Sequence, residues 1–177
     1  TVNGTAVSFS MNQADNFTYT GTPTVNISNN TSTAAIVQFG STSGATSTNA
    51  LSFNVVNGSY TITMTGTVWR DLNFSGFSGT LPNVAKTLYG SLTLSTTMTL
   101  TAGTSTMTFA AATGTKTITS NTKTMDFPVT ISGGATYQIL DALTLGSTRT
   151  ITVSAGEVQW KNGVTHTAGT WSINGTS

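Results

Sequence analysis

The chain of 177 residues contains no cysteine, only three prolines and very little charge. Without cysteine it forms neither disulfides nor thiolate metal sites. Charged residues make up 6% of the chain, far below the roughly 25% that is usual for soluble domains. Proteins bind nucleic acid through clustered Lys and Arg, so a formal net charge of +1 predicts no nucleic-acid partner.

Long apolar runs are missing as well. The chain has no stretch of about 18 apolar residues, so we expect no membrane-spanning helix. Eight Phe, four Tyr and three Trp are spread along a chain of low net charge, whereas disordered chains carry high net charge and few aromatic residues. We therefore expect an ordered chain, and its length suffices for one domain with a hydrophobic core.

Serine and threonine make up about a third of the chain. In the stretch 89–131 they alternate with apolar residues, as in the segments LTL at 92–94 and MTF at 107–109. A period of two is typical of β-strands with one buried face, and Thr fits a pleated surface well. Helical periodicity over ten or more residues is absent, so the sequence predicts an all-β protein.

The two parts of the chain differ in regularity. Residues 1–50 are irregular and are predicted to form a cap or a strand-exchange segment, with short strands at 7–10, 17–20, 24–28 and 35–39. Residues 51–177 are predicted to form one repetitive domain. Within it, LSFNVV-NG-SYTITMT indicates a strand, a tight turn at Asn57-Gly58 and a second strand, because Asn-Gly adopts positive φ angles readily. Asn162-Gly163 is another turn signal.

Large apolar residues recur at intervals of 17 or 18 positions. The main series is Phe74, Leu92, Phe109, Phe127 and Leu145, and the additional pairs are Leu100 with Ile118 and Val153 with Trp171. Self-similarity near 20 residues is typical of solenoids, in which each coil stacks on the next. We therefore predict a β-solenoid resembling a parallel β-helix, with coils of about 17–18 residues and threonine columns outside. An antiparallel β-sandwich or jelly roll is the alternative, because its turns produce similar alternation.

Several segments resemble a Thr-rich repetitive family of bacteriophage and environmental viral sequences that is also seen among bacterial surface proteins. The segments are TPTVNISNN, NFSGFSGT, LYGSLTLSTTMTLTAG, TKTITSNTKTMDFPVTISGG and QILDALTLGSTRTITVSAGEVQWKNG. The resemblance covers about residues 20–177. It implies a β-solenoid segment of a virion surface or fibre protein, and it transfers no functional residue to this chain.

Three of the five acids are candidates for a catalytic pair. Asp126, Asp141 and Glu157 are 15 and 16 positions apart, close to one predicted coil, and on that spacing they line up along an outer edge. Carboxylates roughly 5–9.5 Å apart can hydrolyse a glycosidic bond. Stacked like charges repel each other, so a polysaccharide-degrading activity ranks last among the functions that we consider.

Other catalytic patterns are absent from the sequence. It contains no recognisable Ser-His-Asp arrangement and no nucleotide-binding loop. His166 is the only histidine, and a zinc site needs several ligands. We therefore predict that the chain is not an enzyme and that it has no catalytic residue, cofactor or metal.

Aromatic side chains are the candidates for ligand contact. The favoured interpretation is that these rings fill coil interiors or cap the stack. Contact with a cell-surface glycan is the functional alternative, because an outward ring can stack on a sugar. The candidates are Trp69, Trp160, Trp171, Tyr89 and Tyr137.

Together these observations favour a structural module on a virion surface, either a tail fibre or a capsid decoration, that serves assembly and host attachment. A secreted bacterial or archaeal adhesin or filament subunit is the alternative, and a polysaccharide-degrading tailspike is the third candidate. A stacked β-structure exposes unpaired strands at its ends, so we expect a homo-oligomer, either a trimer or a fibre. The predicted location is the virion surface or the extracellular space.

Overall fold

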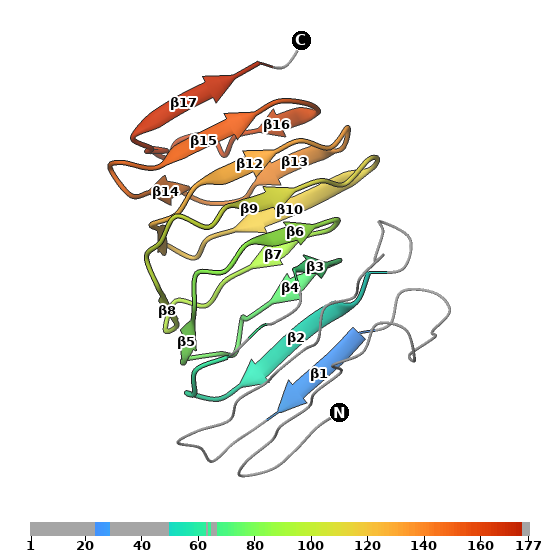
Figure 1. Cartoon of the computed structure of the whole chain (residues 1–177), viewed down its shortest axis with the longest axis vertical. Coiled ribbons are helices and arrows are strands. Elements are labelled where there is room, and N and C mark those ends of the chain that lie inside the picture. Colours follow the sequence, from blue (N-terminus) through green and yellow to red (C-terminus); the bar gives the residue numbers. More distant parts are fainter. Residues whose placement is uncertain (1–23, 29–49, 63, 65–66, 175–177) are drawn as a thin grey trace.

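The chain folds into a β-solenoid, described here from a computed structural model (Figure 1). The structure describes residues 24–28, 50–62, 64 and 67–174. This part of the chain contains seventeen strands and no helix. Its strands pair in parallel and stack into about six turns, which confirms the predicted fold class.

Two long parallel sheets form two sides of the solenoid, and short strands form the third. Sheet I consists of β1 (Thr24–Ser28), β2 (Ser52–Asn57), β4 (Leu72–Asn73), β7 (Leu92–Thr93), β10 (Thr115–Thr119), β13 (Thr136–Ile139) and β16 (Glu157–Gln159). Sheet II consists of β3 (Val68–Trp69), β6 (Lys86–Leu88), β9 (Met107–Phe109), β12 (Val129–Ile131), β15 (Thr150–Val153) and β17 (Thr170–Ile173). The third side holds the pairs β5 (Thr80–Leu81) with β8 (Thr99–Leu100) and β11 (Thr124–Met125) with β14 (Thr144–Leu145).

Each turn visits the three sides in the same order. The chain passes through sheet I, then the third side, then sheet II, as in the turn formed by β13, β14 and β15. Figure 1 shows the strands stacked from β1 at one end to β17 at the other. Residues in the inner strands of the two long sheets therefore pair with partners about one turn earlier and one turn later in the sequence, which is the defining property of a solenoid.

Sheet II shows why the sequence alternates. Successive side chains of a strand point to opposite faces, and the strands pair in register, so like residues stack. The outer face carries a column of half-buried threonines, which are Thr87, Thr108, Thr130 and Thr152. The inner face carries a matching buried column of Leu88, Phe109, Ile131 and Val153. The predicted arrangement of apolar columns inside and threonine outside is present in this sheet.

The predicted coil length of 17–18 residues is wrong. Paired residues in sheet I are 19 positions apart between β2 and β4 and 28 apart between β1 and β2. Phe109 pairs with Ile131 rather than with Phe127. All five residues of the series that suggested the shorter period are buried, but they lie on different sides of the solenoid. Because the corners differ in length, a constant spacing in sequence does not return a residue to the same side.

The two additional spacing pairs fail for the same reason. Leu100 lies in β8 on the third side, whereas Ile118 lies in β10 of sheet I. Trp171 pairs with Ile151 rather than with Val153. Each of these residues does occupy a strand, but the strand partners differ from those that the spacing indicated.

Of the strands and the turn predicted before residue 66, the structure describes one strand and the turn. The strand expected at 24–28 is β1 and pairs in parallel with β2. The strands expected at 7–10, 17–20 and 35–39 lie outside the described residues. After β2 the chain turns at Gly58, whose φ is +117°, and Thr61 then bridges Thr80 in parallel. Asn57-Gly58 therefore forms a corner of the solenoid, and the residues after it pair with the next coil.

Two buried tyrosines of the core differ in what their hydroxyls contact. The Tyr137 hydroxyl accepts a hydrogen bond from the Ala111 backbone N–H at 3.0 Å. The Tyr60 hydroxyl is buried without a partner among the described residues, and its ring packs against Phe77 at a centroid distance of 5.3 Å. Burial raises the pKa of Tyr60 to about 12, because the charged form loses its hydration.

Phenylalanine at these two positions tests the difference. We expect Tyr60→Phe to stabilise the fold by about 1 kcal/mol, because it removes a buried hydroxyl that lacks a partner. The matched variant Tyr137→Phe should destabilise the fold by about 1–3 kcal/mol, because the Ala111 N–H loses its acceptor. Thermal or denaturant unfolding followed by circular dichroism measures both changes. Shifts of the same sign would contradict the hydrogen bonding described here.

Candidate functional site

The structure separates the five aromatic candidates into interior and surface residues. Trp69 in β3 and Tyr137 in β13 are buried, so their rings fill the interior of the solenoid. Tyr89, directly after β6, is half-buried. Trp160 is half-buried after β16, and Trp171 in β17 is 41% exposed. Only Trp160 and Trp171 lie together at a surface.

These two residues and His166 form what we call the aromatic cluster. The Trp160 and Trp171 rings have centroids 5.2 Å apart and meet edge to face at 67°. The His166 ring lies 5.0 Å from Trp160 at 64°. Trp160 also packs against the end of the hydrophobic core, so the cluster rests on the last turn of the stack. Edge-to-face contacts of this kind are favourable because of the ring quadrupoles.

Hydrogen bonds to both ring nitrogens hold His166 in place. The Leu143 backbone N–H donates to Nδ1 at 3.1 Å, so Nδ1 is the acceptor nitrogen of a neutral ring. Nε2 lies 3.1 Å from the Lys161 carbonyl oxygen and donates to it. The histidine thereby ties the loop after β16 to the preceding turn, and it keeps Trp160 in position. Sequence analysis treated His166 as a lone residue because neither backbone partner carries a recognisable motif.

The aromatic cluster is suited to binding. It presents the partly exposed rings of Trp160 and Trp171, which can pack on apolar C–H surfaces such as the face of a sugar. Both nitrogens of its one titratable side chain, His166, are engaged with the backbone. Its chemistry is therefore that of a contact surface.

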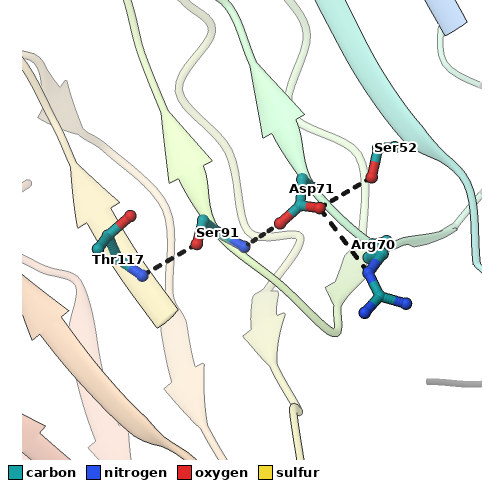
Figure 2. A network of polar contacts seen from close by, with 5 residues as sticks. All are labelled: Ser52, Arg70, Asp71, Ser91 and Thr117. Carbon is teal, nitrogen blue, oxygen red and sulfur yellow. Dashed lines mark hydrogen bonds and ion pairs between the residues drawn. The ribbon is translucent and has the colours of Figure 1, made fainter. Parts of the chain in front are cut away.

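A second polar feature is a network around Asp71, shown in Figure 2. The Asp71 carboxylate accepts hydrogen bonds from the Ser52 hydroxyl at 2.8 Å and from the Ser91 backbone N–H at 2.7 Å. The Arg70 guanidinium lies 3.9 Å away. The Ser91 hydroxyl in turn accepts from the Thr117 N–H at 3.0 Å. The network therefore crosses four consecutive turns on sheet I, and the Arg70–Asp71 ion pair is a minor part of it.

A glycine makes the Asp71 contact possible. A Cβ at position 90 would meet the Asp71 Oδ1 at 2.2 Å, so only glycine lets the carboxylate approach the next turn this closely. The same arrangement of a short polar side chain against a glycine of the next turn recurs at Asn83 with Gly103 and at Asp126 with Gly146. These corners position turns relative to one another.

The three acids that were predicted to line up do not share an edge. Asp126 follows β11 on the third side, Asp141 follows β13 of sheet I, and Glu157 begins β16. Each of them accepts hydrogen bonds from a neighbouring turn. Asp126 accepts from Arg149 Nε at 2.7 Å, and Glu157 accepts from the Thr136 hydroxyl at 3.1 Å. Asp141 accepts from the backbone N–H groups of Ser120 and Asn121. These residues therefore do not form the single outer edge that their spacing indicated.

Within residues 24–28, 50–62, 64 and 67–174, no group of three or more His, Asp or Glu side chains is placed to hold a metal ion. No helix in this part of the chain is long and apolar enough to cross a bilayer.

Sequence analysis missed a buried cation. Lys86, the first residue of β6, points into the core and is 2% exposed. Its ammonium donates to the Val84 carbonyl at 3.0 Å and to the Pro82 carbonyl at 3.3 Å. Burial lowers the pKa of Lys86 to about 8, because the charged form is poorly solvated there. The alternation in the sequence KTL of β6 places Lys86 on the same face as Leu88, so the burial of Lys86 could have been predicted from it.

Comparison with known proteins found no matching family model, no matching curated protein and no matching solved structure. The resemblance to phage and viral repeat proteins therefore stays a prediction.

The pKa of Lys86 predicts how stability depends on pH. Because that pKa falls from 10.5 in the unfolded chain to about 8 in the fold, the unfolded chain binds more protons between these values. The free energy of unfolding should therefore rise as the pH increases from about 8 to about 10. Above pH 10 the buried Tyr60 acts in the opposite sense, because its pKa is about 12 in the fold and the unfolded chain loses the proton first.

Replacing Lys86 by methionine removes this dependence. We expect Lys86→Met to stabilise the fold at pH 7 by about 1–4 kcal/mol, because an apolar side chain replaces a buried charge, and to abolish the rise between pH 8 and 10. Lys123→Met, in the turn before β11, is the matched control and should leave the rise intact. Urea unfolding across this pH range measures it, and a flat profile in the unmodified chain would refute the assignment.

Proposed function

We propose that this chain is a structural β-solenoid module of a virion surface, either a tail fibre or a capsid decoration, that serves assembly and host attachment. One observation carries the proposal, and it concerns the four acids among the described residues. Each of them binds a group of a neighbouring turn, and they are Asp71, Asp126, Asp141 and Glu157. Acids that hold turns together support the integrity of a rigid stack rather than the chemistry of a reaction.

The composition supports the same function. A stack coated with threonine and serine, with few charged side chains, relies on its in-register strands for stability and presents a uniform polar surface. A secreted adhesin or filament subunit would use the same construction, and the genes beside this one separate the two, since tail and capsid genes accompany a virion protein. Antibodies against the chain should label virus particles; labelling of a cell envelope instead would favour the adhesin.

The last turn supports assembly. β16 and β17 are the outermost described strands of sheets I and II at this end, and strands with unpaired edges tend to pair with other chains. Trp171 is 41% exposed and Ile173 is 62% exposed, although their register partners Ile151 and Val153 in the turn below are buried. The inner face of this turn is therefore open, and another turn of the same kind would cover it.

A charge on this face tests assembly. We expect the unmodified chain to self-associate and Ile173→Lys to dissociate it, because a lysine between two stacked turns would be buried without a partner. Leu140→Lys is the matched control, since Leu140 is 46% exposed directly after β13, away from the open face. Size-exclusion chromatography with light scattering reads the mass. A monomer of the unmodified chain at high concentration would refute the proposal.

The aromatic cluster supports attachment through a glycan. The exposed Trp171 ring and the half-buried Trp160 ring lie at the open end, where a ligand reaches them without entering the solenoid. Of the five aromatic candidates, Trp69 and Tyr137 are enclosed by the core. The proposed contact is therefore made by Trp160 and Trp171.

Removal of one ring tests the glycan contact. We expect Trp171→Ala to weaken binding to a cell-surface polysaccharide by about tenfold or more, because exposed tryptophans at a binding surface are typical hot spots. Leu140→Ala serves as the control and should bind normally. Calorimetry or a polysaccharide array provides the readout. If the unmodified chain retains no glycan, or if both variants bind equally, the contact is not made by this cluster.

A further inference from the structure

Two Asn-Gly pairs lie wholly within the described residues, and their surroundings differ. Both pairs form turns: Gly58 has a φ of +117° and Gly163 has a φ of +74°. Asn-Gly is the sequence in which an asparagine side chain most readily reacts with the following backbone nitrogen, because glycine offers no side chain to hinder the approach. Whether it does so in a folded protein depends on the freedom of the turn.

The Asn162-Gly163 turn is exposed to solvent and is not packed against any described part of the chain. It lies between β16 and the bridge at Thr167, and both of its residues are exposed. A Cβ added to Gly163 would meet no atom within 4 Å. The Gly163 nitrogen donates no hydrogen bond to a described residue. No contact among the described residues therefore restrains the Gly163 nitrogen.

The Asn57-Gly58 turn is held by its neighbours. Asn57 is the last residue of β2 and pairs with Ser28 of β1, and its side-chain oxygen is buried. The Gly58 carbonyl accepts two hydrogen bonds from Ser78, one from the N–H at 2.8 Å and one from the hydroxyl at 3.0 Å. Rotation of this peptide requires local opening of the solenoid.

We propose that Asn162-Gly163 is a site of spontaneous deamidation. The Gly163 nitrogen, having lost its proton to hydroxide, attacks Cγ of Asn162; the new N–C bond forms as the Cγ–Nδ2 bond breaks and ammonia leaves. The resulting five-membered succinimide adds one water at either carbonyl. It opens to aspartate or to isoaspartate, so one water is consumed and one ammonia released without any change of oxidation state.

The position of the turn gives this reaction a structural consequence. The Lys161 carbonyl, next to Asn162, accepts the hydrogen bond from His166 Nε2, and His166 Nδ1 accepts from the Leu143 N–H. Isoaspartate adds a methylene to the main chain at position 162 and displaces the Lys161 carbonyl. The loop is then released from the turn below it, and the packing of Trp160 against His166 changes. This inference is independent of the proposed function.

The folded chain and the chain in denaturant are incubated side by side in mildly alkaline buffer and digested with chymotrypsin. The peptides 54–60 and 161–171 then report the two pairs separately, and mass spectrometry measures conversion. We expect Asn162 to convert in the fold within about threefold of its rate in denaturant, and Asn57 to be slowed about tenfold or more, because its reaction waits for local opening. Asn162→Gln should abolish conversion of peptide 161–171.

Two results would overturn the proposal: equal protection of both pairs in the fold, or an Asn162 that stays intact in the fold while it converts in denaturant. The structural consequence has its own readout in tryptophan fluorescence. The aged unmodified chain should change its emission, whereas the aged Asn162→Gln variant should keep that of fresh protein. An unchanged spectrum after conversion would show that the product leaves the His166 contacts intact.

Discussion

The in-register pairing of parallel strands is the constraint on which the rest of the structure depends. Each turn must return to the side it left, because a strand that slips by one residue places every side chain on the wrong face. In sheet II this produces a threonine column outside and a buried column of Leu88, Phe109, Ile131 and Val153 inside. Lys86 is the exception on the inner face of sheet II. Its buried ammonium is accommodated because it donates hydrogen bonds to two backbone carbonyls in the corner before β6.

Side chains supplement the strand ladder where the strands are short. β4 and β7 contain two residues each, so their backbone bonds alone align the turns weakly. Asp71 and Ser91 accept hydrogen bonds from the next turns on the same side, and Gly90 permits the close approach. Two of the scarce carboxylates, Asp71 and Asp141, thus accept hydrogen bonds from backbone N–H groups of a neighbouring turn, and a charged acceptor for such a group is worth more than a neutral one. This placement explains how a chain with so few charges uses almost every acid structurally.

The strands and the direction of their side chains could be predicted from the sequence. The partners that each strand meets in other turns could not. Alternation identified the strands at 107–109 and 129–131 and the direction of their side chains, because period two is a property of neighbouring residues. The length of a turn depends on the corners, and these vary without a local signal, so Phe109 was matched with Phe127 instead of Ile131. The partners of Asp71 are likewise 19 and 20 positions away, a distance that no short motif covers.

The open last turn connects the two parts of the proposed function. Trp171 occupies the same column as the buried Ile151, so it is a core residue by position, and it is exposed because none of the described residues covers it. A second turn stacked on this face would bury Trp171 and remove it from contact with any glycan. The proposed assembly and the proposed glycan contact therefore compete for one surface, and a stack formed in this way would expose the aromatic cluster only at its free end. On the proposed function, attachment would therefore take place only where such a stack ends.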